Sequence, residues 1–434
     1  MKPWHHATVT LAVCLLAASG VRADDEFSFD SSEFEKKPLQ LDGYLEIQPG
    51  RAWLNQDGSF YKLNYYNRGQ RDTLDWNTTV LRVNGQYSLG ITSVNLRGYV
   101  AAANDSLGSS NTQRFDEAYI SFKPDPGFTL DIGKVALHWG KGYAWNPVGF
   151  VQRPKDPNDV ELARQGYSMA VADIIHNMDG DLKTVAFTPV IMPVSADMNS
   201  DFGQQGHVNL AGKLYLLYKD TDIDFIYLGT GSKSPRLGID FSRNLGSNLE
   251  VHGEWARIND NERRILGPSG VMRTETDDAT NYLLGLRYLS ENDMTTILEY
   301  YRNGAGYSEA QAKDFFSFVD AGFRQFENTA IDTMLAKAAM ASQAGYGRPN
   351  PMQQYLYLRV SQKEPFDLLY FTPSLTTIVN VDDKSYSLTP ELLYTGVTNL
   401  ELRLRAVWLN GGTGTEFGEK LNSSRLEFRA RFYF

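Results

Sequence analysis

The feature that most constrains this chain is an alternation of apolar and polar residues, repeated in segments of about ten residues. In the last segment, 425–434, every second residue is apolar, including Leu426, Phe428, Phe432 and Phe434, and four of the five residues between them are charged. A period of two places these two sets on opposite faces of a β-strand. Because so many charges could not be buried in a soluble sheet, the pattern predicts an apolar outer face in lipid and a polar face around a wet interior.

The alternation predicts eighteen strands, with sixteen as the alternative count. In lipid every backbone polar group must be paired, so the expected all-β fold is a single closed antiparallel transmembrane barrel. Eight short connections rich in Gly, Pro, Asn and Asp suit tight turns, and they interleave with longer ones, so we expect short periplasmic turns and long extracellular loops. The expected strands lie at 39–48, 74–87, 90–103, 114–123, 128–138, 167–178, 182–192, 209–219, 222–229, 235–243, 248–258, 280–290, 293–303, 352–363, 366–379, 385–395, 398–409 and 424–434.

The first 23 residues are typical of a secretory signal peptide. An apolar core at 9–18 follows Lys2, and small residues before the predicted cleavage site after Ala23 complete the pattern. The core is too short to span a membrane. Cys14 allows an alternative lipoprotein reading, which the preceding Val fits poorly. We therefore expect a short periplasmic tail at 24–38 and the barrel at 39–434.

The export signal, the alternating strands, the interleaved turns and loops, and the terminal Phe434 together resemble Gram-negative outer-membrane β-barrels of the porin-like kind. In strand number the chain also resembles polysaccharide-export barrels of the alginate-export type. The resemblance implies an outer-membrane location, contact with membrane lipid and lipopolysaccharide, and recognition of the strand ending at Phe434 by the barrel-assembly machinery. It leaves the oligomeric state open.

Loop 139–166 is the candidate pore constriction. A loop that folds into the barrel and carries both signs of charge would narrow the lumen and filter solutes. The alternatives are an external loop with solvated charges, or a calcium site built from its three acidic residues. Its charged residues are Lys141, Arg153, Lys155, Asp156, Asp159, Glu161 and Arg164.

Loop 304–351 is the longest connection, and its middle has helical spacing. Apolar residues recur every three or four positions over 309–327 and again over 329–343, before a stretch rich in Gly and Pro ends the pattern. Two short helices there predict a lid or a plug in the lumen. The alternative is a helical hairpin packed on the outer rim.

Polar positions of the strands predict the lumen wall. The candidates are Arg82, Arg97, Arg236, Glu250, His252, Glu254, Arg403, Arg405, Arg425, Arg429 and Arg431. The five arginines of the last two strands would attract anions if they were only partly paired. The alternative is ion pairing with Glu401 and Glu427, and with Asp42 and Glu46 of the first strand. The small basic excess on that wall predicts a weak anion preference.

Large aromatics at the two ends of outward faces predict interfacial girdles, which would contain Trp255, Trp408, Phe432 and Phe434. The net charge of −10 gives no reason to expect a nucleic-acid partner. We expect no cofactor, no metal and no catalytic residues, since no nucleophile elbow and no His pair with metal spacing occurs. The expected function is a channel for small hydrophilic solutes. The alternatives are a polymer-export or lipid-handling barrel gated by its loops, and third a barrel-embedded hydrolase.

Overall fold

The computed structural model describes residues 38–157 and 164–434. The predicted signal peptide and all but the last residue of the predicted tail lie outside the described residues, as do Asp159 and Glu161 of the candidate constriction.

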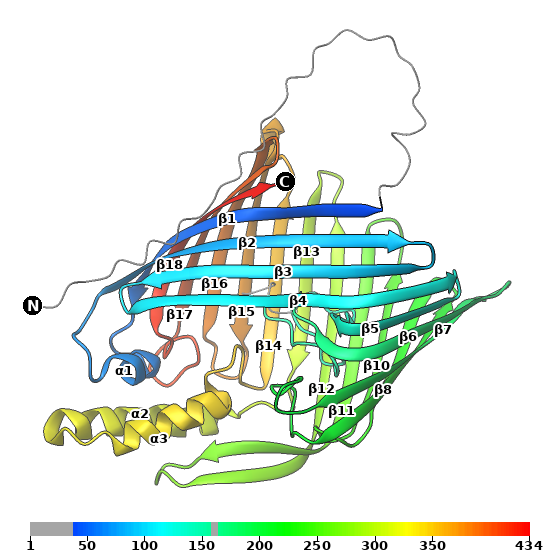
Figure 1. Ribbon diagram of the computed structural model, residues 1–434. Helices are drawn as coiled ribbons and strands as arrows, with labels where there is room; N and C mark the ends of the chain where they lie inside the picture. Colours follow the sequence, from blue (N-terminus) through cyan, green and yellow to red (C-terminus); the bar gives the residue numbers. More distant parts are fainter. Residues whose placement is uncertain (1–37, 158–163) are drawn as a thin grey trace, which may run out of the picture. The chain divides into compact units, whose positions relative to one another are not determined.

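Eighteen antiparallel strands form one sheet that closes on itself, because β1 pairs with both β2 and β18 (Figure 1). The predicted strand number of eighteen is confirmed. The strands are β1 (Leu39–Leu54), β2 (Thr73–Leu89), β3 (Thr92–Asp105), β4 (Gly108–Asp125), β5 (Phe128–Val135), β6 (Tyr167–Asn177), β7 (Leu182–Val194), β8 (His207–Tyr218), β9 (Thr221–Leu228), β10 (Arg236–Asn244), β11 (Leu249–Leu266), β12 (Met272–Leu289), β13 (Met294–Arg302), β14 (Gln354–Gln362), β15 (Phe371–Asn380), β16 (Tyr386–Val397), β17 (Leu400–Asn410) and β18 (Asn422–Tyr433).

The two faces of the sheet differ as the alternation predicts. Along β18, Leu426, Phe428 and Phe432 are exposed on the outer face, whereas Glu427 and Arg431 between them are buried on the inner face. An outer face of exposed apolar side chains is favourable in lipid and unfavourable in water. The closed sheet also leaves no unpaired strand edge, as a membrane-spanning sheet requires.

Three details of the sheet differ from the sequence prediction. The expected loops 104–113 and 259–279 are strand hairpins, closed by turns at 106–107 and 267–271. Residues 366–370 were expected in a strand but belong to the turn 363–370, which contains the short 3-10 helix η4 (Pro365–Asp367). The two hairpins lie at the long-loop end, beyond the part of the wall with an apolar outer face, where the alternation that marks strands is weak. The turn 363–370 lies at the short-turn end, and its apolar residues resemble those of an outward strand face.

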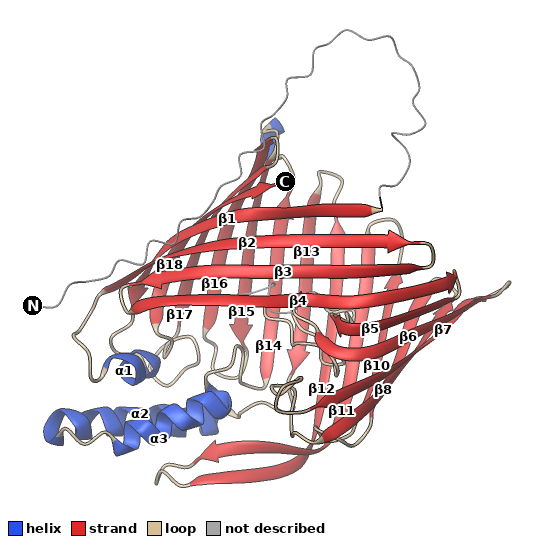
Figure 2. Cartoon of the chain, in the orientation of Figure 1, coloured by secondary structure: helices blue, strands red, loops and turns tan. Residues whose placement is uncertain are grey.

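The connections distinguish two ends of the barrel. At the short-turn end, connections of two to eight residues join β2 to β3, β4 to β5 and each later pair up to β16 and β17. The long-loop end carries the described helices other than η4 (Figure 2). These are α1 (Ser59–Tyr65), which the sequence analysis missed, α2 (Glu309–Thr329), α3 (Thr333–Ala341) and the π-helix η3 (Ser342–Tyr346). No helix among the described residues is both long enough and apolar enough to cross a membrane.

The helices of the long insertion begin and end near the predicted positions. Ser308 caps α2 by accepting from the Gln311 backbone N–H, and the Gln311 side chain accepts from the Ser308 backbone in return. Ala330 adopts a left-handed φ of 58°, which ends α2 and allows the chain to turn into α3. The predicted pair of helices is therefore present, with the break at 330.

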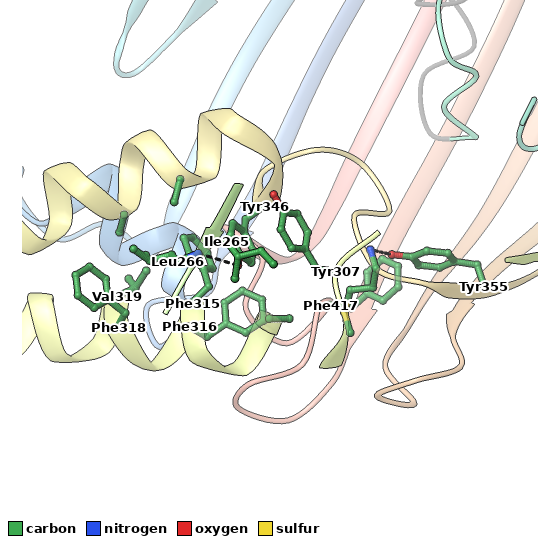
Figure 3. Packing of buried hydrophobic residues seen from close by; sticks show 14 of the residues in the cluster. Ile265, Leu266, Tyr307, Phe315, Phe316, Phe318, Val319, Tyr346, Tyr355 and Phe417 are labelled. Carbon is green, nitrogen blue, oxygen red and sulfur yellow. Dashed lines mark hydrogen bonds between the residues drawn. The ribbon is translucent and has the colours of Figure 1, made fainter. Parts of the chain in front are cut away.

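An aromatic cluster packs these helices onto the long-loop end (Figure 3). Tyr346 lies between two rings, stacking on Tyr307 with centroids 3.8 Å apart and on Phe315 at 4.4 Å. Its hydroxyl accepts from the Leu266 backbone N–H of the β11 extension at 3.3 Å. The helices are thus held by buried contacts to the barrel strands.

Candidate functional site

Loop 139–166 lies against side chains that project from the inner face of the barrel. Glu254 of β11 accepts the backbone N–H groups of Gly142 at 2.6 Å and Val148 at 3.3 Å. Glu299 of β13 accepts those of Tyr143 at 2.5 Å and Ala144 at 2.9 Å. Bonds from amides to a carboxylate are among the stronger hydrogen bonds in proteins. Two buried carboxylates therefore attach the loop to the wall.

Two glycines allow the loop to approach Glu254 this closely. Gly140 has a φ of +94°, and a Cβ there would lie 2.8 Å from the Glu254 carboxylate. A Cβ on Gly142 would lie 2.4 Å from the Trp145 carbonyl oxygen. A larger residue at Gly140 would push the loop away from Glu254, and one at Gly142 would clash within the loop itself.

Lys141 places its ammonium group between two buried aspartates of the wall. Its Nζ lies 3.0 Å from Asp224 of β9 and 3.8 Å from Asp240 of β10, and Lys213 approaches Asp224 at 3.8 Å. Buried charges are tolerated only when they are paired in this way. The pairing couples the loop to two further strands.

His252 lies between two further acidic side chains of the inner face. Its Nε2 lies 2.9 Å from Glu299 and its Nδ1 lies 3.5 Å from Glu250, whose carboxylate also accepts the Tyr143 hydroxyl at 2.9 Å. The structure therefore brings together the predicted residues Glu250, His252 and Glu254 with the predicted loop.

The loop reaches the side of the barrel opposite its origin. It leaves β5, and Trp145 stacks on Tyr301 of β13 at 5.1 Å and packs against Tyr355 and Tyr357 of β14. In a ring of eighteen strands, β14 is nine positions from β5. The loop thus follows the inner wall from β9 to β14 before it returns.

Three further predicted loop charges, Arg153, Lys155 and Asp156, follow Trp145 on the half of the loop that leads to β6. Arg153 pairs with Asp201 at 2.5 Å, and Lys155 donates from Nζ to the Gly142 carbonyl at 2.5 Å, which holds the two halves of the loop together. Asp156 faces a cavity described below. Arg164 is exposed.

The arginines of the last two strands form a separate wall, which we call the arginine wall. Four of them have carboxylate partners at close range. Arg431 lies 2.7 Å and Arg429 3.6 Å from Glu46, Arg425 lies 2.9 Å from Glu427, and Arg403 lies 3.1 Å from Glu401.

Arg405 lies opposite Glu391 of β16 and Glu427 of β18 in the strand register. Glu391, which the sequence count omitted, also approaches Arg403 at 3.6 Å. With Asp42, Glu46, Glu391, Glu401 and Glu427, this face carries five carboxylates for its five arginines. This geometry corresponds to the alternative in which the arginines of the last two strands are paired with carboxylates.

The wall continues through β2 to β4. Arg82 is buried and lies 2.8 Å from Asp116, which also accepts from Arg114 at 2.7 Å. Arg97 lies 2.8 Å from Glu117. A bulge in β4 at this point aims both Asp116 and Glu117 at the inner arginines. Arg236 is half-buried at the start of β10, which is not one of the strands of this wall.

Helix α2 contacts elements from opposite sides of the ring at the long-loop end. Asp320 pairs with Lys62 of α1 at 2.6 Å, and α1 connects β1 to β2. Two residues earlier, Phe318 lies against Gly270 in the β11–β12 hairpin. Since β11 is nine strands from β2, segments from opposite sides of the ring meet at the middle of α2.

A cavity of about 310 Å³ lies where the loop and the arginine wall meet. Asp156 contributes from the loop, Arg425 from β18, Phe60 from α1, and Phe417 and Lys420 from the β17–β18 connection. The cavity therefore offers both signs of charge beside aromatic surface, directly below the helices of the long-loop end.

The four predicted interfacial aromatics all have exposed side chains. Trp408 is exposed near the long-loop end of β17, and Phe432 and Phe434 are exposed at the short-turn end, which suits the two interfaces of a bilayer. Trp255 is exposed as well, but it is the seventh residue of β11, which continues to Leu266, so it does not lie near the long-loop end of its strand as predicted.

A closed eighteen-stranded antiparallel barrel with an apolar exterior, a charged interior and an inward loop has the fold of a porin-like β-barrel. No family model matches the sequence, and no curated protein matches it either. Among solved structures, the chain is similar to OccK5 (OpdH) of Pseudomonas aeruginosa, with a TM-score of 0.52 and 12% identity, covering 91% of this chain and 98% of that one.

The chain is also similar to OccK11 (OpdR) of Pseudomonas aeruginosa, with a TM-score of 0.49 and 11% identity over 91% of this chain and 95% of that one. A triple mutant of Rhodopseudomonas blastica porin matches with a TM-score of 0.43 and 9% identity, over 91% and 100%. At these identities the likeness concerns the fold alone.

Several residues of the site were not predicted. Asp224, Asp240 and Glu299 lie in strands that the sequence analysis placed correctly, on faces set by the alternation. The alternation that assigned Glu250 and Glu254 to the inner face also assigns these three residues to it. Trp145 gave no signal of its own, because its role depends on where the loop lies.

Proposed function

We propose that the protein is an outer-membrane channel that passes small hydrophilic solutes. The observation that carries this proposal is the closed eighteen-stranded ring with charged inner and apolar outer faces, since a barrel of this size encloses an aqueous lumen. Planar-bilayer recording tests it. The purified protein should produce discrete conductance steps, and a persistently silent bilayer would favour a plugged or structural barrel.

We further propose that loop 139–166 is the constriction. Glu254 and Glu299 hold it against the β11 and β13 wall, which leaves the solute path between the loop and the arginine wall. The double change Glu254→Gln and Glu299→Gln should loosen the loop and alter conductance. The matched control is Asp181→Asn with Asp220→Asn, which removes two exposed carboxylates from short turns, away from both the loop and the arginine wall.

The ion preference of this path depends on the arginine wall. The sequence predicts a weak anion preference, and the carboxylate of Glu391 makes us expect a small one. Replacing Arg405 and Arg429 together by Glu should move the reversal potential toward cation selectivity. An unchanged conductance and reversal potential would mean that these two arginines lie away from the permeation path.

The partners follow from this location. We propose that lipid and lipopolysaccharide surround the apolar outer face and that the barrel-assembly machinery recognises the final strand. Phe434 supports the second point, because its backbone exchanges hydrogen bonds with Gly43 and completes the pairing of the last strand with the first. Removing Phe434 should reduce the assembled fraction, measured by heat-modifiable mobility of outer-membrane fractions.

The alternative of a polymer-export or lipid-handling barrel gated by its loops has one observation in its favour, namely that helix α2 joins α1 to the β11–β12 hairpin at the long-loop end. Uptake of small solutes into proteoliposomes distinguishes the two. Size-limited swelling supports the channel, whereas no swelling with wild type and swelling after loss of α2 supports the gated barrel.

A further inference from the structure

The turn between β14 and β15, residues 363–370, is unlike the other connections at the short-turn end. It has eight residues, whereas the other turns there have two to four. It also presents large apolar side chains without cover: Phe366 is 94% exposed, Leu369 62%, Leu368 55% and Tyr370 52%. Channel function gives these side chains no role.

Hydrogen bonds within the turn fix its backbone conformation. Glu364 donates its backbone N–H to the Phe371 carbonyl at 2.8 Å and accepts the Tyr370 N–H on its own carboxylate at 2.9 Å. Glu364, Phe366 and Tyr370 adopt left-handed φ values of 47°, 57° and 67°. Residues with a Cβ are strained in this region, so the surrounding bonds hold a conformation that points the apolar groups outward.

The exposed side chains continue the lipid-facing surface of the barrel. Phe371, the next residue, lies on the outer face of β15 with Leu375, and both are exposed. The Phe371 ring contacts Tyr394 of β16 at a centroid distance of 4.8 Å. The Tyr370 carbonyl accepts from Thr395, which keeps the turn in line with β16 rather than over the lumen.

We propose that this turn inserts its apolar side chains into the membrane leaflet at the short-turn end, and so anchors that end of the barrel in the bilayer. The turn combines the apolar side chains of Phe366, Leu368, Leu369 and Tyr370 with the charged residues Lys363, Glu364 and Asp367, a mixture that suits the boundary between headgroups and acyl chains. The inference rests on the proposed outer-membrane location.

Site-specific labelling tests the proposal. Residues 24–434 contain no cysteine, so single variants Phe366→Cys, Leu404→Cys and Val271→Cys can each carry one environment-sensitive fluorophore. Leu404 is exposed on the outer face in mid-strand and reports membrane embedding, and Val271, 63% exposed at the tip of the β11–β12 hairpin, is the control outside the bilayer. Folding of each variant is checked by heat-modifiable mobility.

In proteoliposomes with doxyl-labelled phospholipid, we expect several-fold stronger quenching at 366 than at 271, with quenching at 404 as well. Quenching at 404 but not at 366 overturns the anchor and leaves the membrane location intact. Protection at 366 from both lipid quencher and aqueous iodide also overturns it, because a protein or a second copy would then cover the turn. Absence of quenching at 404 contradicts the membrane location itself.

Discussion

Arg403 and Leu404 are neighbours in β17 whose side chains point to opposite faces of the wall. Leu404→Arg should damage assembly, because a cation on the lipid face at mid-bilayer costs roughly 2–4 kcal/mol. Arg403→Leu should be tolerated, since Glu391 and Glu401 then face the aqueous lumen. The measurement is the heat-modifiable folded fraction in outer membranes. Equal damage from both changes would contradict the assigned faces.

Lys233, in the connection before β10, provides a prediction about pH. Burial, followed by the nearby charges of Arg236 and Arg348, lowers its pKa to about 7. The unfolded chain then binds more protons than the folded one between about pH 7 and the ordinary lysine pKa near 10.4, so stability rises with pH in that window.

The matched variant for this residue is Lys233→Met, which keeps the length of the side chain and removes the titrating group. Thermal unfolding in detergent should show the wild type gaining stability relative to Lys233→Met as the pH rises from about 7 to 10. A constant difference across this range would mean that the ammonium group keeps its ordinary pKa.

At the scale of elements, the ion pair between α1 and α2 is the most accessible test of the helices at the mouth. Lys62→Glu should place two like charges together where a partly buried pair worth about 1 kcal/mol now lies, and so release α2 from α1. We expect longer or more frequent high-conductance states in bilayer recordings. The charge swap Lys62→Glu with Asp320→Lys should restore wild-type recordings, and a swap that behaves like the single change would exclude this pair as the cause.

The elements also show which parts of the structure the sequence could predict. All eighteen strands were located because lipid on one side and water on the other impose a strict alternation on them. The helices near 309–343 were located from their helical spacing. The hairpins beyond the membrane and helix α1 were missed, since water on both faces removes the alternation and α1 has only seven residues.

The site was predicted less completely for a physical reason. Parity along a strand assigns Glu254 to the inner face, but it does not say which strand lies across the lumen from a given loop. The contacts of Tyr143 and Ala144 with Glu299 depend on how the loop folds back, which local patterns do not encode. The sequence also leaves open whether the arginines of the arginine wall are paired. Glu391 lies on β16, and local patterns do not show that it approaches Arg403 of β17.

For the whole molecule, the two ends of the barrel predict an orientation. Tags in the β11–β12 hairpin, for example after Ser269, or in the 304–351 insertion should be reached by protease or antibody on intact cells. Tags at 291–292 or at the β16–β17 turn should be protected until the cells are permeabilised. Labelling of both sets on intact cells would refute the orientation of the termini toward the periplasm.

The seam between β1 and β18 has a consequence for how the molecule is made. Glu46 and Arg431, 385 residues apart, lie side by side only when both ends of the chain have arrived. Until then the sheet has two open edges, and a chain that stops early keeps them, with rows of unpaired amides and carbonyls ready to join other strands. Pairing of β1 with β18 therefore distinguishes the closed barrel from a truncated chain, whose open strand edges are prone to aggregation.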